Sequence, residues 1–576
     1  MRYREFIIKN YKAIQELNVK LNRNVIPLIG VNESGKTSIL QAILAFDKDK
    51  DSLLDGAHIS ARNRYQVSGQ RRDCEIIAAV EIDDEDFDQI GKEARLGMDG
   101  ELYNWLKEKR SEHKEILLKR NYENSTFSDT YTICEDLTAV APERQVESLT
   151  KAIAKRLPNI LYFDDFSDRV PKKISFKDSF VEDHRYTRGK EREWQEIVKE
   201  IFVRVLEDED AFDDFLKNED EDDQKNYLSD VAQSLDAEII SEWKKLSGAF
   251  SSEPSDNLKL EIDYNHKDGI HEFEFKVMDF ENGRNQRRFS INERSKGFQW
   301  FFNFIMKLKF NPKYKTNPRN AIYLLDEPGS YLHASAQTEL LKKLCEIGGE
   351  NTILYCTHSQ YLLDPDIINI ADIRIVSKSD GKINLENYGE ASVERTSGAF
   401  SALNDALHLK FGFMDSARKE YIVTEGILEY YFYKMFMRLE SLCIIPGAGC
   451  GNLKELISIV IANGEKFLVV LDNDAEGRRA KNAYEEFFGR AFHENVYMYE
   501  GVGSRQESFM LEDLLEESDV AMINSETDCR DIKKAIATLF FAEAEIKEKV
   551  KNELSNDAKE RIAIVERKIK EHFSDN

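Results

Sequence analysis

Four carboxylates follow two apolar, β-prone segments in the C-terminal third of the sequence. The segments are 421–423 and 466–471, and the carboxylates are Glu425, Glu429, Asp472 and Asp474. Open parallel sheets place their ligands at the carboxyl ends of strands, so we expect these side chains to gather at one sheet edge. Clustered carboxylates repel one another unless a cation lies between them, and oxygen ligands favour Mg²⁺ or Mn²⁺. The pattern predicts metal-assisted phosphodiester chemistry; the alternative is a set of solvated caps at strand ends.

A glycine-rich segment near the N-terminus has the residues of a phosphate-binding loop. It lies between an apolar segment at 25–29 and a helical pattern at 39–46, and its residues are Gly30, Asn32, Glu33, Ser34, Gly35, Lys36, Thr37 and Ser38. The glycines allow backbone N–H groups to close around phosphate oxygens, and the helix N-terminus adds a positive potential. Lys36 would reach the β- and γ-phosphates, and Thr37 would hold Mg²⁺. The segment predicts ATP binding with one Mg²⁺.

Three further segments carry residues suited to nucleotide chemistry. The apolar segment 320–325 is followed by Asp326 and Glu327. We expect Asp326 to bind Mg²⁺ through water and Glu327 to polarise the attacking water. The apolar segment 352–356 leads to His358, which we expect to sense the γ-phosphate. Backbone donors at the start of an amphipathic helix could cap a phosphate, with ordinary helix capping as the alternative. The residues at this helix start are Ser295 and Gly297.

Composition limits the class of protein. A chain of 576 residues has room for about three domains, and its hydrophobic content of 41% supports ordinary cores. It contains no apolar run of about eighteen residues and no signal-peptide pattern at its start, so we expect a cytoplasmic protein without membrane contacts. Seven cysteines without a C-x-x-C pair argue against a disulfide framework and a zinc ribbon.

The charge distribution bears on nucleic-acid binding. A formal net charge of −26 argues against non-specific binding to nucleic acid. The charge is uneven, however, because basic residues cluster at 284–296 and 307–319 while acids dominate 207–223. A locally basic groove on an acidic body is therefore compatible with the composition. We expect the acidic run to be a solvated turn, because it lacks the spacing of a calcium loop.

The order of these segments predicts an α/β protein with four regions. Residues 1–164 form the first part of the ATPase and residues 254–398 its second part. Between them, apolar residues recur at three- and four-residue spacing from 192 to 249, which predicts a helical insertion or dimerisation arm at 165–253. Residues 399–576 form the region with the acidic site.

Two resemblances extend this interpretation. The phosphate loop, the serine segment, Asp326 with Glu327, and His358 occur in the order found in ATP-binding-cassette (ABC) ATPases of the SMC, RecF and Rad50 kind. That resemblance implies an ABC-type head in which the serine segment of one subunit completes the ATP site of another, and therefore at least a homodimer. The glutamate-then-DxD pattern of residues 425–474 is similar to the Toprim domain of topoisomerases, primases and a group of nucleases.

An ABC-type head followed by a Toprim domain resembles the OLD (overcoming lysogenization defect) family of ATP-dependent endonucleases. This family includes the Gabija nuclease subunit and retron-associated effectors of anti-phage defence. The resemblance covers nearly the whole chain except 165–253. It implies two-metal hydrolysis of DNA, gated by the ATPase head. One metal would be held by Glu425, Asp472 and Asp474, and the other by Glu429, Glu512 and Ser508. Lys533, or its neighbour Lys534, would be the basic residue of the site.

The resemblance also implies partners. These are DNA, further copies of the chain, and either a reverse transcriptase with its small retron DNA or a UvrD-like helicase. Three other functions stay open: a RecF- or SMC-like DNA-repair ATPase whose Toprim domain is inactive, a topoisomerase or primase, and a nucleotide-responsive scaffold. The sequence shows neither a nucleophilic-tyrosine domain nor a zinc module, which argues against a topoisomerase and a primase.

Overall fold

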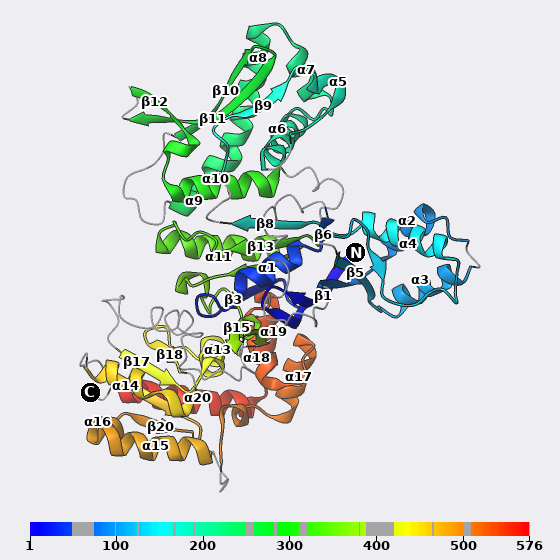
Figure 1. Ribbon diagram of the computed structural model, residues 1–576. Coiled ribbons are helices and arrows are strands. Elements are labelled where there is room, and N and C mark those ends of the chain that lie inside the picture. The colour runs from blue at the N-terminus through cyan, green and yellow to red at the C-terminus, as the bar shows by residue number, and fades with distance from the viewer. Residues whose placement is uncertain are drawn as a thin grey trace. The chain divides into compact units, whose positions relative to one another are not determined.

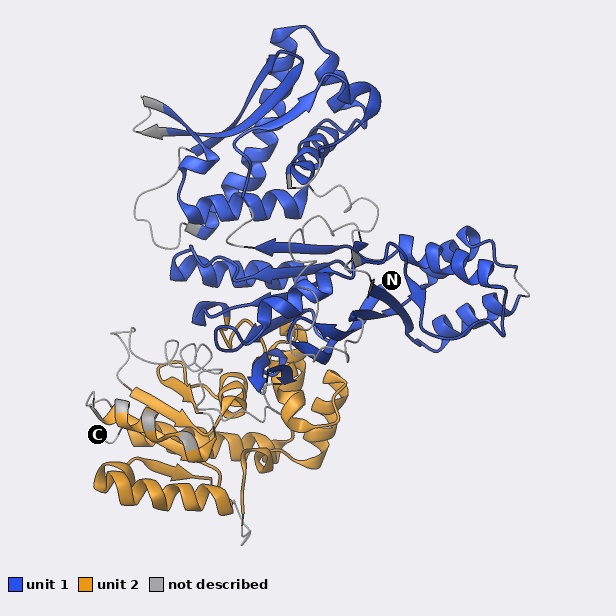
Figure 2. Cartoon of the chain, in the orientation of Figure 1, with its two compact units in different colours: residues 1–362, 371–394, 398–400 blue, residues 363–370, 395–397, 401–576 orange. Residues whose placement is uncertain are grey.

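The computed structural model (Figure 1) describes most of the chain, in fourteen segments. They are 1–48, 74–97, 100–123, 126–164, 169–187, 190–247, 258–281, 285–310, 320–379, 381–387, 420–447, 449–462, 466–499 and 508–574. The chain divides into two compact units (Figure 2): unit 1 comprises residues 1–362, 371–394 and 398–400, and unit 2 comprises residues 363–370, 395–397 and 401–576. Mixed helices and parallel strands in both units confirm the predicted α/β class.

A six-stranded sheet in unit 1 carries the nucleotide-binding segments. Its order is β16-β15-β3-β14-β13-β8, and all neighbours are parallel except β15 and β16. The strands are β3 (Val25–Ile29), β8 (Ile160–Asp164), β13 (Ile322–Asp326), β14 (Thr352–Cys356), β15 (Arg374–Ser379) and β16 (Lys382–Asn387). The central strands are almost wholly apolar, as expected where helices cover both faces of a parallel sheet. Helices α1 (Lys36–Leu44) and α11 (Ala334–Gly348) contact this sheet.

A second sheet of unit 1 is antiparallel and packs into the same core. Its order is β2-β1-β4-β5-β6, with β7 paired to β5. The strands are β1 (Arg2–Tyr11), β2 (Ile14–Lys20), β4 (Cys74–Glu81), β5 (Ile116–Glu123), β6 (Thr126–Phe127) and β7 (Thr132–Ile133). Buried residues of this sheet and of α1 form one cluster with those of β8, β13 and β14. Helices α2 (Asp84–Glu93), α3 (Glu101–Ser111) and α4 (Glu143–Lys155) contribute to that cluster.

The region predicted as a helical arm combines helices with a third sheet. The helices are α5 (Phe180–Asp183), α6 (Lys190–Leu206), α7 (Ala211–Lys217), α8 (Glu221–Leu235) and α9 (Ser241–Ser247). Strands β9 (Ile174–Lys177), β10 (Leu258–Lys267), β11 (Ile270–Glu281) and β12 (Asn285–Ser290) form one antiparallel sheet. Strands β9 and β10, which lie on either side of the predicted boundary at 253, therefore belong to one sheet. The division of the chain into four regions remains a prediction. Helix α10 (Lys296–Lys309) follows this sheet.

The acidic run 207–223 differs from the solvated turn that was expected. It contains α7, in which Phe212, Phe215 and Leu216 are buried, and the start of α8. Phe212 packs against Phe273 of β11, with ring centroids 5.8 Å apart. The apolar residues inside the run anchor it to the sheet, while its acids apart from Asp213 stay exposed to solvent.

Unit 2 is built on a four-stranded parallel sheet of order β18-β17-β19-β20. The strands are β17 (Glu420–Thr424), β18 (Cys443–Pro446), β19 (Lys466–Leu471) and β20 (Val496–Met498). Its helices are α13 (Ile427–Phe436), α14 (Lys454–Ala462), α15 (Ala475–Phe488), α16 (Arg490–His493), α17 (Glu517–Thr527), α18 (Ile532–Phe540), α19 (Ala544–Glu553) and α20 (Asn556–Ser574). In the described part of the chain, no helix combines the length and apolar character needed to cross a membrane.

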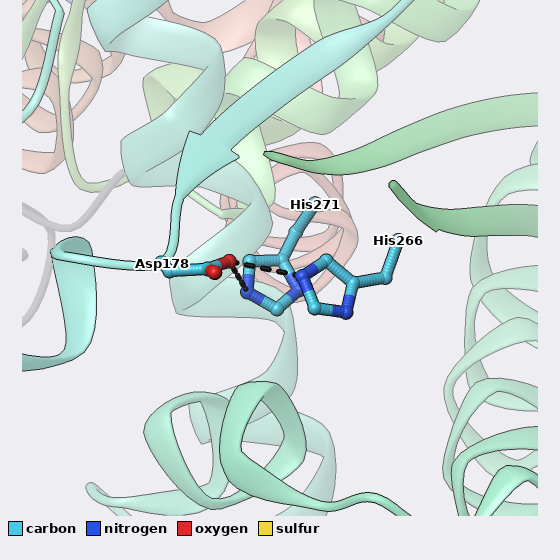
Figure 3. A group of neighbouring side chains, drawn as sticks. All are labelled: Asp178, His266 and His271. Carbon is cyan, nitrogen blue, oxygen red and sulfur yellow. Dashed lines mark hydrogen bonds and ion pairs between the residues drawn. The ribbon is translucent and has the colours of Figure 1, made fainter. Parts of the chain in front are cut away.

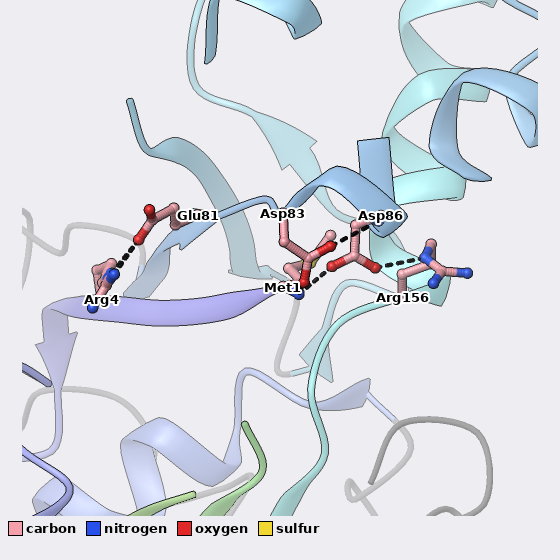
Figure 4. A network of polar contacts seen from close by, with 6 residues as sticks. All are labelled: Met1, Arg4, Glu81, Asp83, Asp86 and Arg156. Carbon is pink, nitrogen blue, oxygen red and sulfur yellow. Dashed lines mark hydrogen bonds and ion pairs between the residues drawn. The ribbon is translucent and has the colours of Figure 1, made fainter. Parts of the chain in front are cut away.

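A buried ion pair ties α4 to α2 beside the antiparallel sheet (Figure 4). The Asp83 side chain caps α2 by accepting the Asp86 N–H at 2.8 Å. Asp86, whose side chain is 4% exposed, accepts a hydrogen bond from Arg156 Nε at 2.7 Å. The next residue toward the N-terminus, Lys155, pairs with Glu93 at 3.3 Å and is 72% exposed. The two neighbouring basic residues thus hold one buried and one solvated ion pair.

Replacing Arg156 with alanine should lower the free energy of unfolding by about 1.5 kcal/mol, because it removes one cationic partner of the buried Asp86 carboxylate and leaves the Met1 ammonium as the other. Urea denaturation of the full chain, followed by tryptophan fluorescence, measures the change. Lys155→Ala is the matched control and should change stability by less than about 0.5 kcal/mol, because its pair lies in solvent. Equal losses in both variants would contradict the assignment.

Candidate active sites

The phosphate-loop segment leaves β3 and enters α1 with little room around its glycines. Gly35 has φ 109°, and a Cβ added there would lie 2.1 Å from Ile383 Cδ1. A Cβ on Gly30 would lie 2.2 Å from the backbone oxygen of Val376. Glycine is therefore required at both positions, and it keeps the loop backbone against β15 and β16.

Lys36 lies across the loop that precedes it. Its Nζ donates to the backbone oxygens of Gly30 at 3.0 Å and Val31 at 3.2 Å, and it lies 2.8 Å from His358 Nε2. Burial lowers the pKa of Lys36, and burial and the Lys36 charge lower the pKa of His358. The neutral imidazole can therefore accept a hydrogen bond from the ammonium. An ammonium surrounded by loop carbonyls is suited to exchange these contacts for phosphate oxygens.

Asp326 sits at the carboxyl end of β13 opposite the start of α1. Its Oδ1 accepts a hydrogen bond from Thr37 Oγ1 at 3.2 Å, and its Oδ2 accepts one from Tyr162 at 3.3 Å. Burial raises the pKa of Asp326, and the nearby charge of Asp164 adds to this effect. A hydroxyl and two carboxylates of this kind form an oxygen-rich set that Mg²⁺ accepts.

Glu327 occupies a strained position next to Asp326. Its φ of 51° lies in the left-handed region, which is costly for a residue with a side chain. Its backbone N–H donates to Cys356 O at 3.1 Å, and its Oε2 accepts the His358 N–H at 3.2 Å. The conformation holds the Glu327 carboxylate against the segment after β14. The structure thus brings Lys36, Asp326, Glu327 and His358 together, and their roles stay predictions.

The remaining predicted nucleotide residues lie in varied settings. Asn32 and Glu33 are exposed, and Ser38 is half-buried in α1. Ser34 Oγ is buried and has no hydrogen-bond partner in the described structure, so the loop contains a polar atom that an anion would satisfy. Ser295 caps α10 by accepting the Phe298 N–H at 3.3 Å, and Gly297 is buried beside Tyr331. The predicted contact of Ser295 with ATP is made between subunits, so one chain does not test it.

The acidic residues of unit 2 follow adjacent parallel strands, as the apolar segments predicted. Thr424 of β17 is paired with Val470 of β19, so Glu425 and Asp472 lie beyond neighbouring strand ends. Glu425 Oε1 accepts the Asp472 N–H at 2.7 Å, and Asp472 Oδ1 accepts the Leu511 N–H at 3.1 Å. These contacts join both strand ends to the turn Leu511–Leu514 that carries Glu512.

Two of the predicted ligands also cap helices. Glu429 Oε2 accepts the Gly426 N–H at 2.9 Å at the start of α13, and Asp474 Oδ1 accepts the Gly477 N–H at 2.6 Å at the start of α15. Helix capping therefore explains part of the acidic pattern. In the described chain these carboxylates do not form a group of three whose ligand atoms all lie within 4.8 Å of one another. A cation would have to draw them together from these backbone contacts.

Glu512 and Lys533 form the charged pair at this site. Lys533 Nζ lies 2.8 Å from Glu512 Oε1, and the side chain of Glu512 is 15% exposed. Burial alone would lower the pKa of Lys533, but the Glu512 carboxylate raises it. Glu512 Oε2 is buried without a hydrogen-bond partner in the described structure, so it is free to bind a cation. Of the two predicted lysines, Lys533 is therefore the one whose side chain contacts an acidic residue of the site.

The pKa values of three acidic residues in unit 2 are raised because their carboxylates are buried near one another. Burial, with the charges of Asp472 and Glu425, raises the pKa of Glu429 to about 8. Burial and the charge of Asp472 raise the pKa of Glu425 to about 7, and burial and the charge of Glu512 raise the pKa of Asp472 to about 6. Carboxylates that resist ionisation together are those that a bound cation stabilises. The donor set and the unpartnered Glu512 oxygen therefore fit a divalent metal.

Sequence reasoning did not identify every residue of these sites. Tyr162 was only part of an apolar strand, and its hydroxyl contacts Asp326. Asp164, which ends β8, is the cross-strand partner of Asp326. Glu476, in the first turn of α15, raises the pKa of Glu425. Asp164 could have been recognised in the sequence because it ends an apolar strand, as Asp326 does. Ser508, by contrast, is exposed and lies beside Phe509, which pairs with Asn473.

Known proteins resemble this chain over different lengths. The uncharacterized protein MJECL43 of Methanocaldococcus jannaschii is 34% identical over 97 residues, which are 16% of this chain and 25% of that protein. This chain thus spans a quarter of that relative. Endonuclease GajA of Bacillus cereus is 22% identical over 512 residues, which cover 85% of this chain and 78% of that protein.

Solved structures of SMC heads also resemble the chain. The SMC head bound to the C-winged helix domain of ScpA covers 69% of this chain and 99% of its own, with a TM-score of 0.39 and 14% identity. The SMC head domain from Thermotoga maritima covers 67% of this chain and 99% of its own, with a TM-score of 0.31 and 12% identity.

Residues 1–363 match the family described as AAA ATPase domain. The match contains the phosphate loop, Ser295, Asp326, Glu327 and His358, which are the residues that the sequence predicts for nucleotide chemistry. Because it extends over more than half of the 576 residues, the protein belongs to the AAA ATPase domain family.

Proposed function

We propose that the protein is an ATP-binding, metal-dependent DNA endonuclease of the OLD family. The observation that carries this proposal is the hydrogen-bonded link between two adjacent parallel strand ends and the turn that carries Glu512. Glu425 accepts the Asp472 N–H, Asp472 accepts the Leu511 N–H, and Glu512 Oε2 is buried without a hydrogen-bond partner in the described chain. The raised pKa values of Glu425, Glu429 and Asp472 support a cation there. The similarity to Endonuclease GajA over 85% of this chain supports cleavage of nucleic acid.

In this proposal unit 2 is a Toprim-type nuclease domain with two Mg²⁺ or Mn²⁺ ions. The ions, when bound, activate a water and stabilise the leaving oxygen of a phosphodiester. Glu425, Asp472 and Asp474 would hold one ion, and Glu429, Glu512 and Ser508 the other. Lys533 partly neutralises Glu512 and offers an ammonium to a DNA phosphate. Asp474 and Glu429 would keep their capping contacts through one oxygen and use the other as a ligand.

The ATP site in unit 1 would control the nuclease site. Lys36 would bind phosphate oxygens, and Thr37 and Asp326 would hold Mg²⁺. Glu327 would orient the attacking water, and His358 would sense the γ-phosphate. Ser295 and Gly297 of a second copy would complete the site, which makes the active protein a homodimer or a larger homo-oligomer. Nucleotide can control cleavage only if its two states bias the nuclease unit differently.

The family resemblance also leads us to propose a role in anti-phage defence. It implies a partner, either a reverse transcriptase with its small retron DNA or a UvrD-like helicase. Neither partner is supported by the comparisons, and the choice between them stays a prediction. The genes that neighbour this one would distinguish the two, because each partner enzyme has a recognisable sequence.

A second candidate is a RecF- or SMC-like DNA-repair ATPase whose acidic site does not cut. The observation that favours it is the use of Glu425, Glu429 and Asp474 as acceptors for backbone N–H groups, which gives these acids a structural role. The two candidates differ in one measurable property. Only the endonuclease cleaves plasmid DNA in Mg²⁺ or Mn²⁺.

Lys36→Ala should weaken ATP binding by about 100-fold, because it removes the buried ammonium that faces the phosphates. Titration of a fluorescent ATP analogue with the full chain measures the loss. Mg²⁺ binding by the metal-binding carboxylates of unit 2 should be unchanged. Lys20→Ala, an exposed lysine on β2, is the control and should bind ATP normally. Loss of carboxylate metal binding in Lys36→Ala would contradict the two-site division.

Asp472→Asn and Glu425→Gln should each reduce plasmid cleavage by at least about 100-fold, because each removes a charged metal ligand. ATP binding should be retained. Glu486→Gln makes the same charge change at an exposed position of α15 and should cleave like the wild type. Cleavage that persists in both site variants, measured by gel electrophoresis in Mg²⁺ and in Mn²⁺, would eliminate the proposed nuclease site.

The metal-free protein should lose stability as the pH rises toward 8. The pKa of Glu429 is about 8 when folded, and it lies near 4.3 when unfolded, so between these values the folded state binds more protons. The free energy of unfolding therefore falls through this range and levels off above it. Glu429→Gln should reduce this fall, whereas Glu486→Gln should not. Thermal unfolding in a chelator at several pH values measures both.

Mg²⁺ should oppose this pH effect, because it binds the deprotonated carboxylates. In nucleotide-free protein, saturating Mg²⁺ should raise the midpoint of the affected thermal transition by roughly 5 °C more at pH 8 than at pH 6. An equal shift at both pH values, or the same shift in Asp472→Asn as in wild type, would show that Mg²⁺ acts elsewhere.

A further inference from the structure

Three metal-ligating side chains meet at the tip of the β10–β11 hairpin, in the arm region of unit 1 (Figure 3). They are Asp178, His266 and His271, and their ligand atoms all lie within 4.8 Å of one another. Asp178 Oδ1 lies 2.9 Å from His266 Nε2 and 3.1 Å from His271 Nε2. Both imidazoles thus direct the same ring nitrogen at one carboxylate oxygen. The nucleotide and nuclease sites use none of these residues.

The fold fixes this arrangement from three segments. His266 of β10 and His271 of β11 are direct cross-strand partners, and their rings stack with centroids 4.1 Å apart and planes 6° apart. The turn between them has positive φ at Asp268 and Gly269, which a tight hairpin requires. The Asp178 N–H donates to Gly269 O at 3.1 Å, so the residue after β9 is held against the turn. The three ligands are therefore preorganised by backbone pairing.

A tyrosine supports the more buried histidine. Tyr264 Oη lies 2.7 Å from His271 Nδ1, and the side chain of His271 is 3% exposed. Metal-bound imidazoles almost always use their second ring nitrogen in a contact of this kind, which fixes the tautomer and the ring orientation.

We propose that Asp178, His266 and His271 bind a borderline divalent transition-metal ion, with Zn²⁺ as the best match. Two imidazole nitrogens and one carboxylate oxygen are ligands that Zn²⁺ prefers, whereas Mg²⁺ and Ca²⁺ prefer oxygen alone. Both Nε2 atoms would coordinate the ion, and the Nδ1–H of His271 would donate to Tyr264. Three protein ligands leave a position for water or another ligand. The residues line a hollow of about 1650 Å³, so small ligands can reach that position.

The same contacts have a metal-free form. Without an ion, each imidazole carries hydrogen on Nε2 and donates it to Asp178, and His271 Nδ1 accepts from Tyr264. The two forms differ in the position of the protons and in the affinity for metal. A bound ion would link β9 to the β10–β11 hairpin and stabilise the arm region against local opening. This inference is independent of the proposed nuclease function.

The test is binding of Zn²⁺ to the full-length protein in excess Mg²⁺. Excess Mg²⁺ occupies the oxygen-only sites and does not compete for imidazole. Wild type should bind about one Zn²⁺ per chain more tightly than His266→Gln and Asp178→Asn, each of which should weaken this site by more than about tenfold. A competing chromophoric chelator measures the affinity, and a Co²⁺ ligand-field spectrum reports nitrogen coordination.

Matched variants separate this site from other metal binding. His113→Gln removes an exposed histidine that pairs at 3.0 Å with Glu81, the last residue of β4, and should bind Zn²⁺ as wild type does. Tyr264→Phe keeps all three ligands and should weaken Zn²⁺ by about tenfold. Zn²⁺ should also raise the thermal midpoint of wild type but not of His266→Gln. The proposal is overturned if folded His266→Gln binds Zn²⁺ with the affinity and stoichiometry of wild type.

Discussion

Parallel strand pairing determines where the charged groups of this protein lie. In unit 1, β3, β14 and β13 run in the same direction, so the phosphate loop, His358 and Asp326 reach one edge of the sheet. In unit 2, β17 and β19 do the same for Glu425 and Asp472. The hydrogen-bonded register prevents these charges from separating, and partial burial keeps water from screening them. The folded chain therefore holds an electrostatic repulsion that protons, lysines or metal ions must offset.

The two sites offset this repulsion differently. At the nucleotide site Lys36 contributes a buried positive charge, and hydroxyls of Thr37 and Tyr162 donate to Asp326. At the acidic site the cation contact is Lys533 on Glu512, while the other carboxylates accept backbone N–H groups. Protons supply the remaining compensation, which is why the pKa values of Glu425 and Glu429 reach about 7 and about 8. A site that retains protons near neutral pH has carboxylates available for a divalent ion.

Sequence patterns predicted these strand ends well because apolar runs followed by charged residues mark buried parallel strands. They could not choose between Lys533 and Lys534, since both lie on one amphipathic helix and only the fold brings Glu512 to the first. In the acidic run 207–223, the short helix α7 was missed because charges dominate the pattern, although Phe212 and Phe215 are buried and the acids apart from Asp213 are exposed. The His266 and His271 pair did have a signal: an Asp-Gly turn between alternating strands makes them cross-strand partners. Asp178 had none, because only β9–β11 pairing carries it there.

The proposed metal sites of this chain differ in the ligand atoms that they offer and therefore in the ions that they prefer. The acidic site and the ATP site offer carboxylate and hydroxyl oxygens, which suit a hard ion that is abundant and weakly held. The arm site offers two imidazoles fixed by a hairpin, and their nitrogens favour a borderline ion that binds tightly at low concentration. An ion held at the hairpin would stabilise the arm, whose strands β9 to β12 form a sheet of their own. One ion would thus control the stability of the arm, and a different ion would control the chemistry at the acidic and ATP sites.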